Sequence, residues 1–260
     1  MRIIKRDGRE DDLNFSKIKK VITFACDGID GVNSLELEQQ IVPQLKHNMT
    51  TKQIQKTLIQ MAVEKTSVEQ PNWQFVASKL LAYDLYKEAS LNRSYKKTFG
   101  YGDFYSLIKD LTQKGLYGDY ILKHYSRDEV KELGTYIKPE RDYLLNYIGM
   151  KHLADRYAVR GFEGEVLELP QEIFMGVSMH LAMKEQDKLY WAKRMYDVLS
   201  QLKMTVATPT LSNARKPHHQ LSSCFIDTVG DDLKSIYNTN TAFSQVSKMG
   251  GGINYTSALQ

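Results

Sequence analysis

Cysteine is scarce in this chain of 260 residues, and long apolar runs are missing from it. Two cysteines, Cys26 and Cys224, are too few for a disulfide framework, which fits the reducing cytoplasm where we expect the protein to work. Because no stretch of about 18 apolar residues occurs, we expect no membrane-spanning segment and no membrane partner. Residues 1–8 lack the apolar stretch of a secretory signal.

Charge of one sign is not concentrated in any part of the chain either. The net charge is +4 with both signs mixed, which suits phosphate-bearing ligands but does not indicate a DNA-binding protein. The pair His218 and His219 lacks a third ligand at metal-site spacing, so we expect no metal in this chain. Hydrophobic residues make up 42% of the chain and aromatic residues 10%, which is enough to build a core for about two domains.

A β-hairpin followed by four helices is predicted for the first part of the chain. Asp7 and Gly8 are expected to supply the positive φ angles of a tight primed turn within residues 2–15. Apolar residues then recur at helical spacing in four stretches. The expected helix starts are Ser16, Ser34, the capping-box pair Thr50 and Gln53, and Pro71, with Pro43 bending the second helix.

A polar connector at residues 91–102 separates this part from further predicted helices. Ser126 and Glu129 form another capping-box pattern, which opens a helix that Gly134 is expected to end. The other expected elements are helices over residues 104–114 and 117–125, a longer helix over 138–157, a small hairpin over 163–168, and helices over 171–183 and 187–204.

The segment from Thr208 to Phe225, TPTLSNARKPHHQLSSCF, has the composition expected of a reactive site. We predict an ordered loop between short strands at residues 206–208 and 221–226. Cys224 follows two serines, whose small side chains leave a thiol accessible. The alternative that the residues leave open is a buried structural cysteine. Further on, an aspartate at residue 231 or 232 is expected to cap a helix that runs to residue 244.

The segment TPTLSNAR with LSSCF, together with the KRDG hairpin and the four helices after it, resembles the class I ribonucleotide reductase large (alpha, catalytic) subunit. The resemblance implies an α+β, predominantly helical fold in three parts. These are an ATP-cone regulatory domain at residues 1–92, a helical domain at residues 93–204 and the first strands of a ten-stranded α/β barrel at residues 205–254. Residues 255–260 do not continue the pattern of the family.

The resemblance implies that the ATP-cone binds ATP or dATP as allosteric effectors. Lysines can meet phosphates, while short carboxylate and amide side chains can read an adenine amino group. The implied effector site comprises Lys5, Arg6, Asp11, Asn14, Lys17, Thr51 and Lys87. Considered alone, the three lysines fit ordinary solvated side chains, and the resemblance is what favours a ligand site.

For the later part of the chain, the resemblance implies radical-based reduction of ribonucleotides to deoxyribonucleotides. Cys224 matches the first member of a cysteine pair that supplies two electrons, and an external reductant of the thioredoxin or glutaredoxin type restores the pair. The implied substrate-binding residues are Thr208, Ser223, Cys224 and Gly252, and the implied specificity-effector residues are Asp231, Asp232 and Leu233. The radical metal cofactor is expected in a separate small subunit.

The other cysteines that this chemistry requires are expected beyond residue 254. We therefore hypothesise that the chain is the N-terminal piece of a split ribonucleoside-diphosphate reductase large subunit, inactive alone and completed by a separate C-terminal fragment. Its expected partners are that fragment, the small radical-generating subunit, further large subunits in a homo-oligomer, and nucleotides. The alternative is a stand-alone ATP-cone module that senses nucleotides without catalysis.

Overall fold

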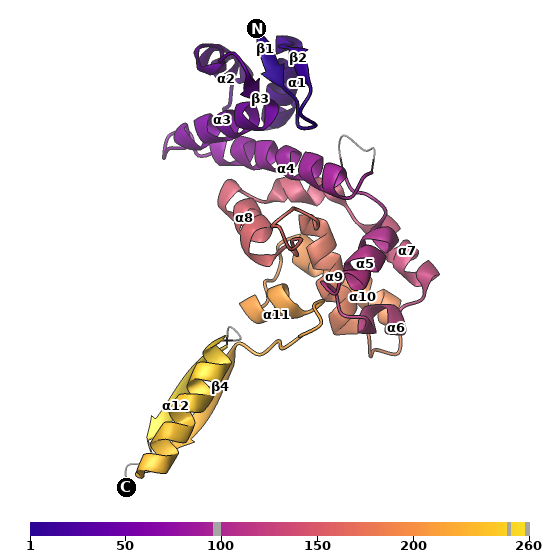
Figure 1. Ribbon diagram of the computed structural model, residues 1–260, viewed down its shortest axis with the longest axis vertical. Helices are drawn as coiled ribbons and strands as arrows, with labels where there is room; N and C mark the ends of the chain where they lie inside the picture. Colours follow the sequence, from indigo (N-terminus) through magenta and orange to yellow (C-terminus); the bar gives the residue numbers. More distant parts are fainter. Residues whose placement is uncertain (96–99, 249–250, 258–260) are drawn as a thin grey trace. The chain divides into compact units, whose positions relative to one another are not determined.

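The computed structural model describes residues 1–95, 100–248 and 251–257, and it divides into two compact units. One unit comprises Met1–Gly102 with Lys138–Gln171, and the other comprises Asp103–Ile137 with Glu172–Gln260. Helices dominate both units and the strands are short (Figure 1), so the expected α+β, predominantly helical fold is confirmed. The first unit joins the predicted ATP-cone to a later stretch of chain, and the predicted boundaries after residues 92, 204 and 254 stay predictions.

The first unit begins with the expected hairpin. Strand β1 (Arg2–Ile4) pairs antiparallel with β2 (Glu10–Asp12) and parallel with β3 (Met49–Thr50), so β1 is the central strand of the sheet. The loop is closed by hydrogen bonds from the Lys5 amide to the Arg9 carbonyl (2.8 Å) and from the Gly8 amide to the Lys5 carbonyl (3.0 Å). Gly8 has a φ of +83° and Asp7 does not share this conformation, so the predicted primed turn is wrong and a three-residue loop ending in glycine takes its place.

Four helices follow the hairpin, as expected. They are α1 (Phe15–Cys26), α2 (Ser34–Ile41), α3 (Thr51–Glu64) and α4 (Trp73–Asn92). The capping box of Thr50 and Gln53 is present at the start of α3. At α1 the N-cap residue is Asn14 and not Ser16, because the helix starts at Phe15, two residues earlier than a cap at Ser16 would allow. Pro43 does not bend α2, which ends at Ile41 and is followed by a short 3₁₀ helix, Val42–Gln44.

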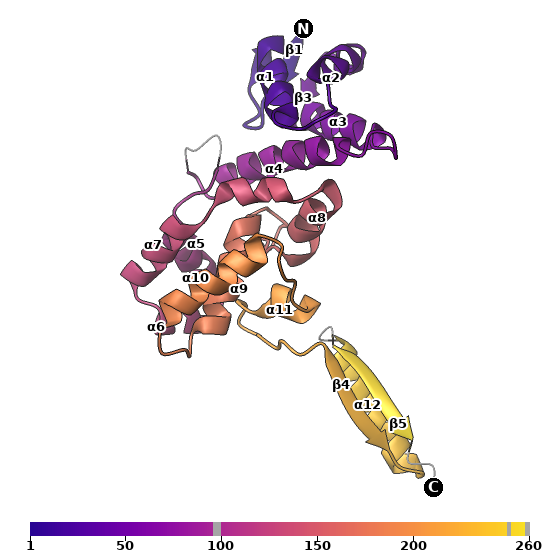
Figure 2. The ribbon, with the colours of Figure 1, turned by 180° about the vertical axis from the view of Figure 1, so that it is seen from behind.

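Helix α4 is buried on more than one side, because it packs against both parts of its unit. Toward the chain start it contacts α1 and α3, and elsewhere it contacts α8 (Tyr147–His152) and the 3₁₀ helix η2 (Pro139–Leu144). Figure 2 shows α4 between these two groups of elements. Its buried residues include Trp73, Leu80 and Tyr86. A helix with apolar residues around its circumference is expected to lie inside a core, so α4 is the element that joins the unit together.

The predicted long helix over residues 138–157 is wrong. The chain there forms η2, then α8, and then a π-helical turn, Leu153–Tyr157. Asn146 accepts a hydrogen bond from the Gly149 amide (2.8 Å) and so caps a new helix in the middle of the predicted one. Beyond it, the predicted hairpin over residues 163–168 is reduced to a single bridge between Arg160 and Val166.

The second unit is built mainly from α5 (Phe104–Gln113), α6 (Tyr120–His124), α7 (Arg127–Tyr136) and α10 (Lys188–Ser200), together with most of α9 (Pro170–Ala182). The capping box of Ser126 and Glu129 at α7 is confirmed. Gly134 does not end α7 but lies inside it, where a Cβ atom would sit 2.9 Å from Cβ of Phe104. This glycine therefore serves close helix packing and not termination.

A parallel strand pair lies near the end of the described chain. Strand β4 (Cys224–Val229) leads into α12 (Leu233–Lys248), which leads into β5 (Gly252–Ser257), and β4 and β5 pair in parallel. The predicted strand at residues 206–208 is wrong, because α11 (Thr208–Asn213) begins at Thr208 with Pro209 in its first turn. Of the predicted tail at residues 255–260, residues 255–257 continue β5, and residues 258–260 lie outside the described residues.

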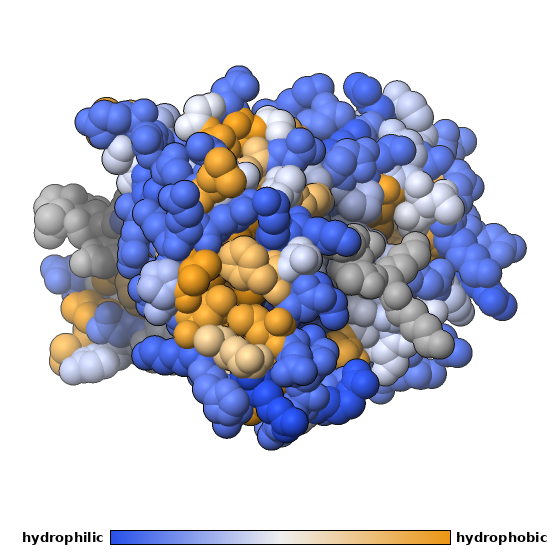
Figure 3. Space-filling view, turned by 90° about the horizontal axis from the view of Figure 1, so that it is seen from above, coloured by the Kyte–Doolittle hydropathy of each residue, from blue (hydrophilic) through white to orange (hydrophobic). Residues whose placement is uncertain are grey.

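Hydrophilic residues predominate on the face shown in Figure 3, with hydrophobic residues gathered in patches among them. Within the described ranges, no helix combines the length and the apolar character that crossing a membrane requires.

Candidate functional site

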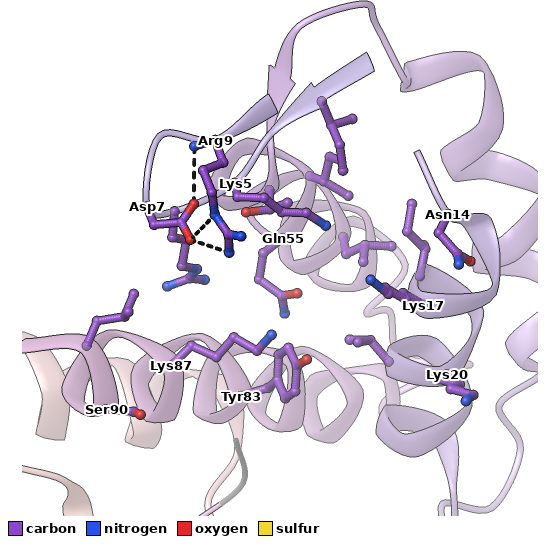
Figure 4. A pocket seen from close by; sticks show the side chains of 18 of the residues that line it. Lys5, Asp7, Arg9, Asn14, Lys17, Lys20, Gln55, Tyr83, Lys87 and Ser90 are labelled. Carbon is purple, nitrogen blue, oxygen red and sulfur yellow. Dashed lines mark hydrogen bonds and ion pairs between the residues drawn. The ribbon is translucent and has the colours of Figure 1, made fainter. Parts of the chain in front are cut away.

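A cavity of about 950 Å³ lies in the first unit, between the hairpin, α1, α3 and α4 (Figure 4). Part of its wall is apolar, because the side chains that these elements turn toward one another belong to the core of the unit. The apolar lining residues on the hairpin, α1 and α3 are Ile3, Leu13, Ile18, Val21, Ile54 and Leu58. Such a wall can accept the flat ring of a ligand without hydrogen bonds.

The remaining wall is strongly cationic. Among the described residues that line the cavity, Asp7 alone is acidic, and six are basic: Lys5, Arg6, Arg9, Lys17, Lys20 and Lys87. Asp7 is held by Arg9, whose Nε donates to Asp7 Oδ2 at 2.8 Å, and this bond lowers the pKa of the Asp7 carboxyl. With its one carboxylate already paired, the cavity presents a net positive potential to a ligand.

Three of these cations are not held in a salt bridge within the described residues, although Lys17 lies near enough to Asp11 to help lower the pKa of that carboxyl. Lys17, Lys20 and Lys87 form no ion pair there, and Lys87 Nζ lies over the ring of Tyr83, 4.9 Å from its centroid. An ammonium group over an aromatic face is oriented without being neutralised. These lysines can therefore accept an anion without first breaking a salt bridge.

The other cations are held by acids. Arg6, whose side chain is 13% exposed, pairs with Asp84, and its Nη1 lies 3.8 Å from Oε1 of Glu88. Burial raises the pKa of the Asp84 carboxyl, while the neighbouring Arg6 opposes that rise. Lys5 Nζ lies 3.1 Å from Asp11 Oδ2. Asp84 and Glu88 therefore fix the position of Arg6, and Asp11 fixes that of Lys5, at the edge of the cavity.

Six of the seven predicted effector residues line this one cavity, although the sequence separates them by up to 82 residues, from Lys5 to Lys87. Asp11 does not line it, and its carboxylate is occupied by Lys5, which lowers the pKa of Asp11. The sequence reasoning missed other polar lining residues, among them Asp7, Arg9, Lys20, Gln55, Tyr83 and Ser90. A signal for two of them existed, because Gln55 lies one helical turn after Thr51, and Tyr83 one turn before Lys87.

The predicted substrate-binding residues are only partly brought together. Cys224 is exposed at the start of β4 and pairs in register with Gly252 on β5. The Ser223 Oγ lies 3.4 Å from the Cys224 Sγ, and the Gly252 amide donates to the Ser223 carbonyl at 2.7 Å. A Cβ at Gly252 would approach that carbonyl to 3.3 Å. Thr208 is exposed on α11, outside this strand pair.

The predicted specificity residues lie where β4 turns into α12. Asp232 Oδ1 accepts a hydrogen bond from the Ser235 amide (3.0 Å), which is the capping role expected of an aspartate there. Asp231 and Leu233 are exposed beside it. Across the described residues, no group of three or more His, Cys, Asp or Glu side chains could hold a metal ion.

Comparisons with known proteins give two family matches. Residues 1–88 match the ATP cone domain, and residues 143–219 match the ribonucleotide reductase all-alpha domain. The cavity lies almost wholly within the first of these matches.

Among whole proteins, the ribonucleoside-diphosphate reductase subunit alpha of Helicobacter pylori is 39% identical over 99% of this chain, which is 32% of its own length. The protein of that name from Treponema pallidum is 50% identical over 75% of this chain, which is 23% of its own length. The ribonucleoside-diphosphate reductase 1 subunit alpha of Escherichia coli is 30% identical over 96% of this chain, which is 33% of its own length. The chain thus spans about a third or less of these relatives. By these matches the chain belongs to the ribonucleotide reductase large-subunit family and corresponds to an N-terminal piece of it.

Proposed function

We propose that this chain is the N-terminal component of a ribonucleoside-diphosphate reductase large subunit, with the cationic cavity as its allosteric site for ATP or dATP. The observation that carries the proposal is the convergence of six basic side chains and an apolar wall on one cavity. A nucleotide needs both, because its triphosphate is polyanionic and its base is flat and largely apolar.

Within that site each group has a proposed task. Lys5 and Lys87 meet the phosphates, Lys17 contacts the edge of the ligand, and Asn14 offers its amide to the base. Thr51 lies at the start of α3, where its hydroxyl can reach a phosphate or ribose oxygen. Arg6 contributes positive charge from a fixed position, and Asp11 acts by holding Lys5.

Calorimetric titration of ATP and dATP into the chain tests the proposed site. Lys87→Gln should weaken binding at least tenfold, because a hydrogen bond to a charged group contributes about 1.5–3 kcal/mol. The matched control is Lys56→Gln, which removes the same charge from an exposed position on α3 outside the cavity lining. Equal affinities for the two variants would contradict the assignment.

We further propose that Cys224 is one of two redox-active cysteines, with its partner on a separate C-terminal fragment. Two thiols that close to a disulfide release two electrons and two protons, which balances loss of the ribose 2′-hydroxyl as water, and a thioredoxin or glutaredoxin type protein then reduces the disulfide. The exposed thiol and its small neighbour Ser223 support this role. The specificity effector would lie at Asp231, Asp232 and Leu233.

Exposed apolar side chains on the βαβ unit support a completing chain. Ile226 is 81% exposed, Leu233 75% and Tyr237 67%, and a two-stranded sheet leaves two edges unpaired. We expect no turnover from this chain alone, and activity when the C-terminal fragment and the radical-generating small subunit are added, with large subunits associating with one another.

In that reconstituted mixture Cys224→Ser should abolish turnover, whereas Cys26→Ser, at a buried position in the first unit, should leave turnover within about twofold. Full activity of Cys224→Ser would disprove the redox role. A chain that binds ATP or dATP but recruits neither partner would be a nucleotide sensor without catalysis.

A further inference from the structure

Asp142 in η2 is a buried carboxylate that accepts its hydrogen bonds from two hydroxyls and an amide. Its exposed fraction is 0%. Its Oδ2 accepts from Tyr86 Oη (2.5 Å) and Tyr101 Oη (2.6 Å), and its Oδ1 accepts from Gln171 Nε2 (2.9 Å). The Tyr101 hydroxyl also accepts from the backbone amide of Gln171 at 2.9 Å. We call these four residues the Asp142 cluster.

The Asp142 cluster lies next to each point where the chain leaves the first unit. Tyr101 is one residue before the end of Met1–Gly102, and Gln171 is the last residue of Lys138–Gln171. Asp142 lies four residues after the start of that second stretch. The chain thus crosses the boundary of the first unit at three points, and each point lies within about four residues of a member of the Asp142 cluster.

The fourth member, Tyr86, connects the cluster to the cavity. It belongs to α4, and the cavity is lined by Tyr83 and Ser90, about one turn away on either side of it, and by the adjacent Lys87. Because a helix moves as a rigid body, a ligand that draws Lys87 inward also shifts the Tyr86 hydroxyl against Asp142. A buried hydrogen-bond network has few alternative arrangements. A shift of the Tyr86 hydroxyl therefore either displaces Asp142 together with its other hydrogen-bond partners or is opposed by them.

We propose that Tyr86 and Asp142 form the joint through which occupancy of the cavity is transmitted to the three places where the chain leaves the first unit. Tyr86 is in this sense a positioning residue, because it does not line the cavity. The inference rests on the proposed nucleotide binding, and it adds a route for the regulatory signal.

Hydrogen–deuterium exchange of the full chain, with and without saturating ATP, tests the joint. In the unaltered protein ATP should slow exchange in the hairpin and α4, and also in residues 139–145 and 171–178. Tyr86→Phe removes one hydroxyl and leaves the ring. We expect this variant to bind ATP within about twofold of the unaltered protein and to keep the protection of the hairpin, while protection of the two distant segments falls at least fivefold.

The matched control is Tyr136→Phe, which removes a hydroxyl that donates to Asp197 Oδ2 at 2.7 Å in the other unit. It should leave the distant protection unchanged. If Tyr86→Phe keeps that protection, or Tyr136→Phe loses it equally, the joint is refuted while nucleotide binding stands. If ATP protects nothing in the unaltered chain, both proposals fail. Should Tyr86→Phe not fold, Asp142→Ala, which removes the acceptor of the Tyr86 hydroxyl, tests the same prediction.

Discussion

Replacing Asp142 by asparagine should change how the stability of the first unit depends on pH. Burial raises the pKa of the Asp142 carboxyl from its ordinary 3.8 to about 6, and the hydrogen bonds from Tyr101, Tyr86 and Gln171 only partly oppose this rise. The amide is uncharged at every pH. Its oxygen can accept from both tyrosines, and its NH₂ can donate to Gln171 if that side-chain amide turns over.

The sign of the effect depends on whether the folded or the unfolded state binds the Asp142 proton more tightly. A folded-state pKa above the unfolded value stabilises the folded state when pH lies below about 3.8, and this contribution is lost as pH rises through about 6. The interval from 3.8 to about 6, at about 1.4 kcal/mol per pH unit, amounts to about 3 kcal/mol. Between about pH 4.5 and about pH 7.5 the unaltered protein should therefore lose about 2 kcal/mol relative to Asp142→Asn.

Urea unfolding followed by Trp73 fluorescence measures this difference. The chain has two tryptophans, so a Trp191→Phe background leaves Trp73, which is fully buried on α4, as the reporter of the first unit. Titration of all other groups is common to both proteins and cancels in the difference. A difference in unfolding free energy that stays constant across this pH range would show that Asp142 ionises equally in both states, and it would refute the argument from burial.

Three further outcomes are expected. Iodoacetamide should label Cys224 in the native protein and spare Cys26 until denaturant is added, because burial raises the pKa of the Cys26 thiol to about 11; mass spectrometry showing equal rates would contradict this. Thr50→Ala, which removes the capping box of α3, should lower unfolding free energy by about 1 kcal/mol in the same urea assay, and no change would mean that the cap is unimportant. Raising ionic strength from about 0.05 M to about 0.5 M should weaken ATP binding severalfold by calorimetry, and a salt-independent affinity would argue against a site dominated by lysines.

Local chemistry explains which parts of the fold could be predicted from the sequence. The capping boxes at Thr50 and Ser126 mark real helix starts, because the bonds involved join residues three apart. The break in the predicted helix over residues 138–157 could not be found in this way. Asp142 is drawn into the protein by tyrosines about 40 and 56 residues earlier in the chain, and no local pattern carries that information.

The same distinction applies to the cavity. Lys5, Lys17 and Lys87 were expected from a family resemblance, and they line one cavity. Arg9 was missed because its place depends on how the hairpin packs and not on any motif, whereas Gln55 could have been found from its helical spacing to Thr51. Asp11 was expected to read a base, but the carboxylate faces Lys5, since a strand residue points to one side of its sheet or the other according to register.

Helix α4 contributes both to the cavity and to the Asp142 cluster, and this double role limits how its length can vary in evolution. One residue inserted between Tyr83 and Tyr86 would rotate the rest of the helix by about 100°, which would turn Lys87 out of the cavity and the Tyr86 hydroxyl away from Asp142 together. No single compensating substitution restores both directions. Insertions and deletions in related chains should therefore gather in the turn at residues 65–72 that precedes α4 and be absent from the 20 residues of the helix itself.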